Sequence, residues 1–466
     1  MTIQKGAHVH FMGICGTAMA SLAGLLQEQG FKITGSDQNF YPPMSLQLEK
    51  LKIPVKTGYS ADNLNPTPQL VIVGNVISRD NPEAVALMEK KIPYMSLPQA
   101  MSEFLIAQRH SIVIAGTHGK TTTTSLMAWV ADQAGLAPGF MVGGIPKNYG
   151  RSFQIPLKNH FVIEGDEYDT AFFDKVPKFI HYKPRSVILT SIEFDHADIY
   201  KDLDHVKSAF VQLLKLIPQD GVLVYNLEDA NIGSMLSECS AQKISYGESD
   251  QADIQIASKK AVREGVEFTL RYQKHAFNFF LPMFGIYNVD NAAAVFALVK
   301  SLGWSVDIDK AFRSFQGVKR RQELIGEPNQ IQIIEDFAHH PTAVEKTIST
   351  FRGRPEQKNV HAVFEPRSAT SRRNIFQEEY AKAFRSADFT YIAKPYAQEK
   401  IPLEQRFSSE KLVQDIEQHG KKAFLCEGVT EIITEIQKNA KPGDTILVMS
   451  NGGFDGIYQK LITALS

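Results

Sequence analysis

Residues 111–124, Ser-Ile-Val-Ile-Ala-Gly-Thr-His-Gly-Lys-Thr-Thr-Thr-Thr, decide the fold class of the central part of the chain. The apolar run 111–115 predicts a buried strand, and the residues after the glycine turn predict a helix that extends through Trp129. Backbone N–H groups of a turn between strand and helix bind phosphate groups. We therefore expect Lys120 to reach the β- and γ-phosphates of a nucleotide and the hydroxyl of Thr121 to bind Mg²⁺.

The spacing of this turn differs from that of the usual phosphate-binding loop. Two residues rather than four separate Gly116 from Gly119, and Ile114 stands where the first glycine is usual. The alternative is an ordinary helix N-terminus that contains Gly-Lys-Thr by chance. Threonines are poor helix formers, and four in a row make that structural interpretation harder to sustain. We assign nucleotide binding to Gly116, Thr117, His118, Gly119, Lys120, Thr121 and Thr122.

Acidic residues follow the next two predicted strands of this central part. The sequence Glu-Gly-Asp-Glu-Tyr-Asp at 164–169 supplies four carboxylates after the strand 161–163. Hard cations such as Mg²⁺ prefer these oxygen ligands; the alternative is a solvated acidic loop. The sequence Ser-Ile-Glu-Phe-Asp-His-Ala-Asp at 191–198 follows the strand 187–190. Its acidic residues and His196 are candidate ligands to a metal or substrate, although a lone histidine is often structural.

The chain before residue 109 alternates between strands and helices. Strands are predicted at 7–12, 31–34 and 70–73, with an apolar helix that ends at Gln29. Because a strand recurs after each helix, we expect a parallel, doubly wound sheet. The run 11–26 also resembles the core of a signal peptide, but its spaced glycines and the strand that follows favour a packed helix.

The turn Gly13-Ile-Cys-Gly-Thr is a weak form of the dinucleotide-binding fingerprint. Cys15 and Ala18 stand where that fingerprint has glycine, which counts against NAD. Asp37 has the spacing expected of an acid near a ribose. A bound diphosphate and a packing role for the glycines both remain open. The candidate residues are Gly13, Ile14, Cys15, Gly16, Thr17, Asp37 and Asn75.

The chain from residue 323 predicts a second doubly wound unit. Strands are expected at 331–334, 360–364, 389–393, 423–426 and 446–449. Ligands of such folds bind beyond the carboxyl ends of the strands, and polar segments follow three of them, at 335–341, 365–373 and 450–454. The arginines of the second segment suit carboxylate recognition. A satisfied loop, a solvated helix start and a glycine turn are the respective structural alternatives.

Composition limits the classes of function. The 466 residues predict about three domains, which we place at 1–108, 109–322 and 323–466. With 50 Lys and Arg against 51 Asp and Glu, the net charge of -1 argues against nucleic-acid and membrane-surface binding. The three cysteines lie far apart in sequence, which suggests neither a disulfide scaffold nor a cysteine zinc site. We therefore expect a reducing, cytoplasmic location.

Taken in order, these segments resemble the ATP-dependent Mur ligases of peptidoglycan synthesis over essentially the whole chain. The matching motifs are Gly116-Thr-His-Gly-Lys-Thr-Thr-Thr, Asp166-Glu-Tyr-Asp, Glu193-Phe-Asp-His, Asn288-Val-Asp-Asn and Asp336-Phe-Ala-His-His-Pro. The resemblance implies an α/β fold with a Rossmann-like N-terminal domain, a central ATPase domain with a mostly parallel sheet, and a Rossmann-like C-terminal domain. It also implies an enzyme that uses ATP and Mg²⁺ to form an amide on UDP-N-acetylmuramate through an acyl phosphate.

The resemblance further implies roles for individual residues. Lys120, Glu167 and His196 would be catalytic, and Thr121, Glu167 and His196 would hold the metal. ATP would also contact Asn288, Asn291, Arg321 and Asp336. The first-domain glycine turn would take the diphosphate of the UDP-sugar. The acceptor would be bound by His340, Arg367, Ser371, Arg372 and Asn451.

Two acceptors compete within this family, L-alanine and the tripeptide L-alanyl-γ-D-glutamyl-meso-diaminopimelate. The segments Gly13-Ile-Cys-Gly-Thr, Gly35-Ser-Asp-Gln-Asn-Phe-Tyr-Pro-Pro-Met-Ser, Glu365-Pro-Arg-Ser and Met449-Ser-Asn-Gly-Gly-Phe resemble the ligases that use the tripeptide. The alanine ligases typically have His-Arg-x-x-Arg where Arg367-Ser-Ala-Thr-Ser stands here. We therefore expect the tripeptide as acceptor, in peptidoglycan recycling, with L-alanine as the alternative.

Three residues depart from the family pattern. Ser191 replaces an asparagine, Tyr287 replaces a histidine near the expected adenine contacts, and Glu335 replaces an aspartate. No lysine can be assigned as a carbamylated metal ligand, and the sequence does not indicate an oligomeric state. Two other classes remain: a nucleotide-dependent switch, which would not explain the first domain, and an NAD dehydrogenase, which Cys15 counts against.

Overall fold

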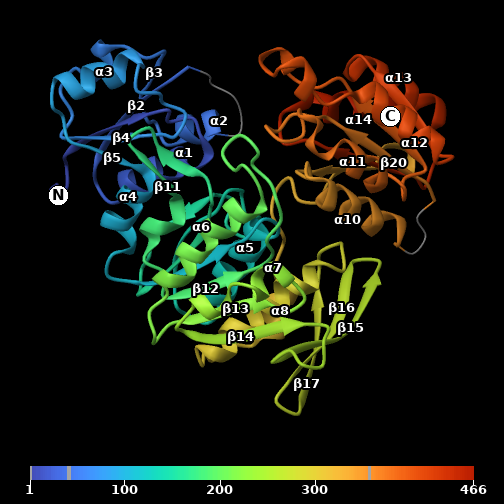
Figure 1. Cartoon of the computed structure of the whole chain (residues 1–466), viewed down its shortest axis with the longest axis horizontal. Helices are drawn as coiled ribbons and strands as arrows, with labels where there is room; N and C mark the ends of the chain where they lie inside the picture. Colours follow the sequence, from blue (N-terminus) through green and yellow to red (C-terminus); the bar gives the residue numbers. More distant parts are fainter. Residues whose placement is uncertain (1–2, 39–43, 355–357) are drawn as a thin grey trace. The chain divides into compact units, whose positions relative to one another are not determined.

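The computed structural model describes residues 3–38, 44–354 and 358–466 (Figure 1). Residues 39–43, which belong to one of the motifs that resemble the tripeptide ligases, lie outside this range. The chain forms an N-terminal, a central and a C-terminal sheet, together with a small two-stranded sheet. This arrangement confirms the predicted α/β class with mostly parallel sheets.

The N-terminal sheet has five strands in the order β3-β2-β1-β4-β5, all paired in parallel. The predicted strands at 7–12, 31–34 and 70–73 are confirmed, and β3 and β5 are additional. The elements are β1 His8–Met12, α1 Thr17–Glu28, β2 Lys32–Asp37, α2 Met44–Lys50, β3 Val55–Thr57, β4 Leu70–Val73, α3 Pro82–Glu89, β5 Tyr94–Ser96 and α4 Leu97–Met101.

The central sheet places the predicted phosphate loop between its middle strand and a buried helix. Its strands up to residue 247 lie in the order β14-β13-β12-β6-β9-β7-β8, and the helix after the loop reaches Gln133, four residues beyond Trp129. The elements are β6 His110–Ala115, α5 Lys120–Gln133, β7 Gly139–Met141, β8 Phe153–Gln154, β9 His160–Gly165, β12 Ser186–Leu189, α6 Leu203–Leu216, β13 Val222–Asn226, α7 Ala230–Gly233, β14 Gln242–Gly247, α8 Asn288–Ser301 and α9 Ile308–Arg313.

Strands β7, β8 and β14 were not predicted, and neither were two further sets of strands. β10 Asp169–Ala171 and β11 Asp174–Pro177 form the small antiparallel sheet. β15 Ile254–Val262, β16 Gly265–Tyr272 and β17 His275–Leu281 form a meander, in which β16 and β17 are antiparallel. Along β16, buried Val266, Phe268 and Leu270 alternate with more exposed residues, as expected of a sheet with one covered face.

The C-terminal sheet has the order β18-β19-β23-β20-β21-β22, and only its edge strand β18 is antiparallel among the strands described. All five strands predicted for this region are confirmed. The elements are β18 Glu323–Gly326, β19 Gln332–Asp336, α10 Pro341–Arg352, β20 Val360–Phe364, α11 Gln377–Ala383, β21 Phe389–Ala393, α12 Ser409–Gln418, β22 Lys422–Cys426, α13 Val429–Asn439, β23 Thr445–Met449 and α14 Ile457–Leu465.

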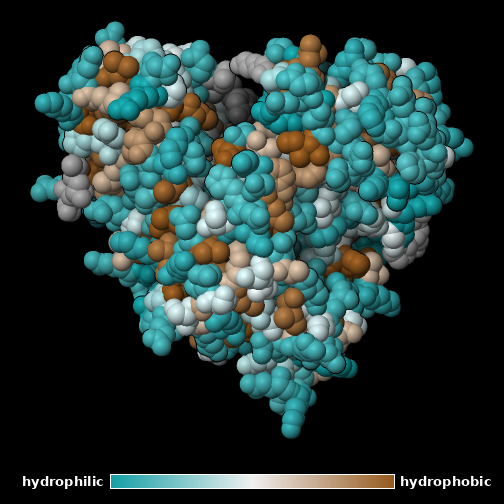
Figure 2. Space-filling view, in the orientation of Figure 1, coloured by the Kyte–Doolittle hydropathy of each residue, from teal (hydrophilic) through white to brown (hydrophobic). Residues whose placement is uncertain are grey.

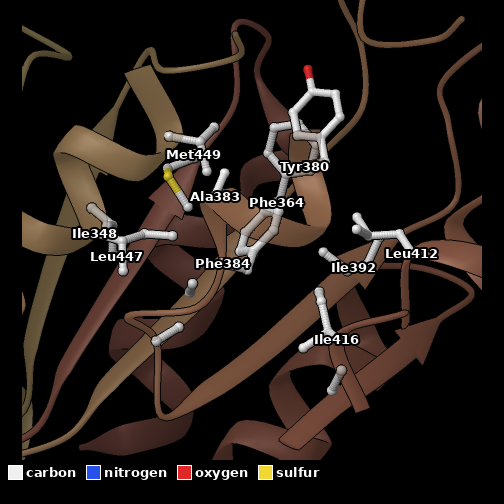
Figure 3. Packing of buried hydrophobic residues seen from close by; sticks show 14 of the residues in the cluster. Ile348, Phe364, Tyr380, Ala383, Phe384, Ile392, Leu412, Ile416, Leu447 and Met449 are labelled. Atoms are coloured by element: carbon white, nitrogen blue, oxygen red, sulfur yellow. The ribbon is translucent and has the colours of Figure 1, made fainter. Parts of the chain in front are cut away.

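Helices cover both faces of this C-terminal sheet. Phe364 of β20 packs with α10, α11 and α12 in the cluster that Figure 3 shows, whereas the adjacent Val363 packs with α13 and α14. This alternation follows from the period of two in a strand, and each large side chain that is fully buried contributes about 1.5–3 kcal/mol to stability. Two covered faces leave the carboxyl edge of the strands as the place where polar side chains can collect.

Contacts divide the chain into two compact units, each described here by itself. The first unit contains the chain up to Glu193, Leu203–Gln255 and Asn291–Ala311, and the second contains Phe194–Asp202, Ile256–Asp290 and Phe312–Ser466. The viewed surface is mostly hydrophilic, with scattered hydrophobic residues (Figure 2). Within the described residues, every helix is too short or too polar to cross a membrane.

Candidate active site

The phosphate loop between β6 and α5 has a backbone that requires its two glycines. Gly116 has φ +127° and Gly119 has φ +82°. A Cβ on Gly116 would lie 2.3 Å from the hydroxyl of Thr190, and one on Gly119 would lie 2.6 Å from Oδ1 of Asn291. The left-handed backbone and the close neighbours both exclude a side chain at these positions. The first-turn N–H groups of α5 project from this tight loop, as phosphate binding requires.

Ser191, which replaces the usual asparagine, holds the loop in place. Its carbonyl accepts the N–H of Thr117 at 2.8 Å, and its hydroxyl accepts the N–H of His118 at 3.2 Å. The hydroxyl of Thr117 in turn accepts the N–H of Glu193 at 2.9 Å, and a carboxylate oxygen of Glu193 lies 3.3 Å from Nε2 of His118. The short serine side chain is therefore sufficient to fix this part of the loop.

Lys120 projects into a group of carboxylates. Its Nζ lies 2.9 and 3.1 Å from the two oxygens of Glu167 and donates to the carbonyl of Gly116 at 2.5 Å. Burial opposes the charged form of Lys120, but Glu167, Asp166 and Glu164 outweigh it and raise the pKa above its ordinary value. The ammonium group therefore stays charged at neutral pH and is available to a phosphate.

Thr121 lies beside a carboxylate that sequence reasoning did not select. Its hydroxyl donates to Oε2 of Glu164 at 3.3 Å, and Oε1 of Glu164 accepts the N–H of Gly143 at 2.6 Å. Glu164 lies near the end of β9 and Glu167 lies just after it, in the same acidic run, and sequence alone does not tell which of the two faces the threonine. Thr121, Glu164 and Glu167 supply the hard oxygen donors that Mg²⁺ prefers.

The two asparagines expected to bind ATP lie one turn apart on α8. Oδ1 of Asn291 accepts the hydroxyl of Thr123 at 3.0 Å, which places Asn291 against the first turn of α5. Nδ2 of Asn288 donates to the carbonyl of Phe284 at 2.6 Å. Asn288 therefore caps the loop that leads into α8.

The glycine turn of the first domain is fixed from β2. The N–H of Gly13 donates to the carbonyl of Ser36 at 2.8 Å, and the N–H of Cys15 donates to Oδ2 of Asp37 at 2.8 Å. Burial and the adjacent Asp37 raise the pKa of the Cys15 thiol to about 12, so it is not a thiolate nucleophile. Asp37, at the end of β2, thus contacts the turn directly through the N–H of Cys15. Asn75 is exposed directly after β4, at the same carboxyl edge of the sheet.

In the second unit, Asp195 is the centre of a polar cluster that includes the predicted His196. Oδ1 of Asp195 accepts the hydroxyl of Thr370 at 2.8 Å and the N–H of His196 at 2.7 Å. Burial favours the neutral acid, but the surrounding His196, His339 and His340 dominate and hold the pKa of Asp195 well below its ordinary value. His196 has φ +56°, a left-handed conformation that is uncommon for histidine.

Both ring nitrogens of His340 have local contacts. Nδ1 accepts the N–H of Thr342 at 3.3 Å as the N-cap of α10, and Nε2 lies 3.2 Å from the carbonyl of Phe194. The carbonyl identifies Nε2 as the protonated nitrogen. His340 therefore fixes the start of α10, a role that sequence reasoning did not assign.

The residues expected to bind ATP near the start of the C-terminal sheet already have partners within the protein. Asp336 is buried, and its two carboxylate oxygens accept the N–H groups of Gln322 and Ala338 at 2.9 and 2.8 Å. Arg321 lies over the ring of Phe337, 4.9 Å from its centroid. Glu335, which replaces the usual aspartate, accepts Nε of Arg320 at 2.6 Å, a partner that explains the longer acid.

The acceptor candidates after β20 and β23 have different surroundings. Nη1 of Arg367 lies 3.2 Å from Glu365, and its guanidinium lies 3.8 Å from the ring centroid of Tyr396. Ser371 is buried, and its hydroxyl accepts that of Ser368 at 2.9 Å. Among the described atoms, Oδ1 of Asn451 is buried without a hydrogen-bond partner, which is the condition expected of a group that awaits a ligand.

Comparisons with known proteins agree with this arrangement. Residues 8–109, 114–299 and 320–452 match, respectively, the Mur ligase family catalytic domain, the Mur ligase middle domain and the Mur ligase glutamate ligase domain. The chain is 39% identical over 462 residues to the UDP-N-acetylmuramate–L-alanyl-gamma-D-glutamyl-meso-2,6-diaminoheptandioate ligase of Escherichia coli K12, with 98% of each chain covered.

Two further proteins place this similarity in context. The UDP-N-acetylmuramate–L-alanine ligase of Acetivibrio thermocellus is 32% identical over 454 residues, which cover 96% of this chain and 94% of that protein. The crystal structure of a murein peptide ligase from Psychrobacter arcticus matches with a TM-score of 0.73 and 34% identity over 99% of each chain.

Proposed function

This chain belongs to the Mur ligase family, and we propose that it joins the tripeptide L-alanyl-γ-D-glutamyl-meso-diaminopimelate to UDP-N-acetylmuramate. Members of this family are ATP-dependent ligases that form a C–N bond, and so is this protein. The observation that carries the proposal is the group formed by Lys120, Glu167, Thr121 and Glu164 at the phosphate loop. It lies in a chain that matches a tripeptide ligase over 98% of its length.

The phosphate loop is proposed to act in the first step, in which a carboxylate of the UDP-sugar attacks the γ-phosphate of ATP. The P–O bond to ADP breaks, and an acyl phosphate forms. A carboxylate is a poor electrophile, and phosphorylation gives it a leaving group. Lys120 and the N–H groups of α5 neutralise the phosphate charge, while Asn291 fixes the first turn of that helix. In the second step the acceptor amine attacks the acyl carbon, and phosphate leaves.

Thr121, Glu164 and Glu167 are proposed to hold Mg²⁺, and His196 is proposed to serve a second Mg²⁺ or the transferring carboxylate. Mg²⁺ when bound neutralises charge on the phosphates. The carboxylates of Glu164 and Glu167 already face cationic or hydroxyl partners in Lys120 and Thr121, so their local chemistry suits a cation. Exchange of Glu167 between Lys120 and a metal would free the ammonium group for the γ-phosphate.

The glycine turn 13–17 is proposed to bind the diphosphate of the UDP-sugar. Its N–H groups and the start of α1 lie at the carboxyl edge of the N-terminal sheet, where doubly wound folds bind ligands. ATP would also contact Asn288, Arg321 and Asp336. We place the sites in domains at 1–108, 109–322 and 323–466, each of which contains one large sheet, and we place the reaction in the cytoplasm, where ATP and nucleotide sugars are available.

Arg367 and Asn451 are proposed to bind the acceptor. The tripeptide carries several carboxylates, and Arg367 provides a planar, charged donor for one of them. The unpartnered Oδ1 of Asn451 provides an acceptor for an N–H group of the peptide. Both residues follow strands of the C-terminal sheet at its carboxyl edge.

Phosphate release with ATP, Mg²⁺ and UDP-N-acetylmuramate tests the proposal, with the tripeptide or L-alanine as the acceptor. We expect release with the tripeptide and little with L-alanine, and mass spectrometry of the product should show the new amide. Release with L-alanine alone would assign the chain to the alanine-adding reaction. The Lys120→Ala variant, assayed in parallel, excludes release by a contaminating ATPase.

A further inference from the structure

The three arginines after β20 have two kinds of contact. Arg367 lies against an aromatic ring, whereas Arg372 and Arg373 bind a loop. Nη1 of Arg372 donates to the carbonyls of Tyr396 and Ala397 at 3.3 and 2.9 Å. Arg373 donates to Oε1 of Gln405 at 2.8 Å. Both arginines therefore fasten the segment 394–408, which connects β21 to α12. Arg367 instead lies against the ring of Tyr396.

Arg367 is held on several sides. The centre of its guanidinium lies 3.8 Å from the centroid of the Tyr396 ring, and Nη1 lies 3.2 Å from Oε1 of Glu365. Gly452 lies against the same side chain, because a Cβ on Gly452 would be 2.2 Å from Nε of Arg367. Glu365 is fixed in turn by the hydroxyl of Ser450. These contacts define the plane of the guanidinium before any ligand is bound.

The position of Tyr396 is fixed by hydrogen bonds of its backbone. Its N–H donates to the carbonyl of Pro366 at 3.0 Å, and Arg372 binds its carbonyl. The next residue, Ala397, has φ +44°, a left-handed conformation that carries strain for a residue with a Cβ. The side chain of Tyr396 remains 51% exposed. A strained loop thus places a large ring against one arginine. Because the ring is half exposed, burial in the core does not account for this position.

We propose that Tyr396 is a specificity-determining positioning residue for the acceptor peptide, which it serves by holding the guanidinium of Arg367 in the plane that receives a peptide carboxylate. This inference rests on the proposed function. A guanidinium recognises a carboxylate through two parallel N–H groups in its own plane, so control of that plane controls recognition. Stacking on an aromatic ring favours one orientation and leaves the guanidinium edge accessible.

The same arrangement would discriminate against L-alanine. The amine of the tripeptide lies far from its γ-glutamyl and diaminopimelyl carboxylates, so an arginine fixed away from the reacting amine can bind one of them. L-Alanine has a single carboxylate, one carbon from its amine, and cannot reach both positions. Arg372 acts through the loop, because it binds the carbonyls of Tyr396 and Ala397.

Steady-state kinetics of three variants test this role. Tyr396→Leu should raise the KM for the tripeptide about 5- to 10-fold, a range that corresponds to the usual strength of a cation–π contact, with kcat within twofold of wild type. The KM values for ATP and UDP-N-acetylmuramate should not change. Tyr396→Phe keeps the ring and should restore the wild-type KM. Leu403→Ala, on the same loop and at a 78% exposed side chain, is the matched control and should have no effect.

A double variant separates positioning from independent binding. Arg367→Lys should raise the KM for the tripeptide, and adding Tyr396→Leu should cause little further increase, since the ring acts through the arginine. Additive effects would overturn the inference, as would equal changes in the KM values for tripeptide and ATP. A Phe variant as weak as the Leu variant would show that the hydroxyl rather than the ring matters, and would also overturn it.

The outcomes distinguish this inference from the proposed function. If the wild-type protein uses L-alanine but not the tripeptide, the proposed function fails. If it uses the tripeptide and Tyr396→Leu has an unchanged KM, only the role of Tyr396 fails. Thermal unfolding of each variant completes the test, because an exposed ring predicts that Tyr396→Leu keeps the wild-type Tm to within a few degrees.

Discussion

The two glycine turns of this protein share a backbone plan and differ in the side chains around it. Residues 13–17 and 116–120 both connect a buried strand to a helix, and both begin with a glycine of positive φ. The central turn ends in Lys120, which faces Glu167. The first turn has no lysine, and its Cys15 N–H is held by Asp37. The first turn is therefore suited to a diphosphate that is only bound, and the central turn to phosphates that react.

The largest expected effect is the loss of the cation from the central turn. Lys120→Ala should lower kcat by about 10³-fold or more, because the γ-phosphate loses its charged partner during transfer. Binding of UDP-N-acetylmuramate, measured by calorimetry, should be unchanged because the first turn does not involve this lysine. Lys175→Ala, an exposed lysine paired with Asp169, is the control. Substantial turnover in Lys120→Ala would place the reactive phosphates elsewhere.

Replacing the first glycine of each turn by alanine should weaken ligand binding to different degrees. Gly116→Ala places its Cβ within 2.3 Å of Thr190 and 2.8 Å of the Ser191 carbonyl, so ATP affinity should fall by more than about tenfold and Tm should drop. Gly13→Ala meets the exposed side chain of Val76 at 3.3 Å and that of Ile77 at an ordinary 3.7 Å, so the loss of UDP-sugar affinity should be smaller.

Gly30→Ala separates backbone strain from collision in this comparison. Gly30 has φ +96°, and a Cβ there meets nothing within 4 Å. Its loss of stability therefore measures the strain of a left-handed alanine alone, about 1–2 kcal/mol. Equal effects of Gly116→Ala and Gly30→Ala on Tm would show that collision with Ser191 and Thr190 is relieved by movement of the loop.

A moderate effect is expected from the acid of the first turn. Asp37→Ala removes the acceptor of the Cys15 N–H, which should weaken UDP-sugar binding by about 5- to 10-fold, since the net contribution of one hydrogen bond, about 1–1.4 kcal/mol, corresponds to this factor. ATP binding should be unaffected. Calorimetric titration of both ligands checks this, and an equal loss for both would mean that Asp37 supports the fold rather than the turn.

The smallest expected effect concerns the histidines in the strands that lead to the two turns. His10 of β1 has a carboxylate partner, Glu83 at 2.8 Å, whereas Nε2 of His110 of β6 contacts the hydroxyl of Ser186 at 2.8 Å. Burial, assisted by His160 and Arg185, lowers the pKa of His110 to about 4. The unfolded chain therefore binds the extra proton between about pH 6.5 and pH 4, and stability falls as the pH decreases through this window.

The His110→Gln variant tests that pH dependence. Its Tm should fall less than that of wild type between pH 7 and pH 4.5, while His205→Gln, at an exposed histidine, should follow the wild-type curve. A His110→Gln curve that is parallel to wild type would remove this histidine from the acid sensitivity of the fold.

Local patterns were sufficient to predict the elements next to the turns and five strands of the C-terminal sheet, but not the short or half-exposed strands. The strands before Gly13 and Gly116 are apolar runs that end in glycine, and a helix follows each. The meander β15–β17 was not predicted, because its half-exposed strands mix lysines and glutamines with the apolar residues. β3 and β5 were missed because strands of three residues are too short to show a period.

Site residues were predictable when a motif contains them, and not when they meet only in space. Lys120 and Thr121 follow from the loop motif. The contact of Thr121 with Glu164 depends on how β9 is oriented beside α5. Tyr396 lies in a polar loop with no pattern around it, and its relation to Arg367 depends on the path of a chain segment 29 residues away. Contacts between distant segments are the information that local sequence lacks.

The division of the chain into two units has a consequence for its biosynthesis. The polypeptide passes between the units after Glu193, Asp202, Gln255, Asp290 and Ala311. The first unit is complete once Ala311 has left the ribosome, but Phe194–Asp202 and Ile256–Asp290 belong to the second unit, which is complete only when the last third of the chain has been made. Translation of residues 312–466 is therefore the interval in which this protein most needs protection from aggregation.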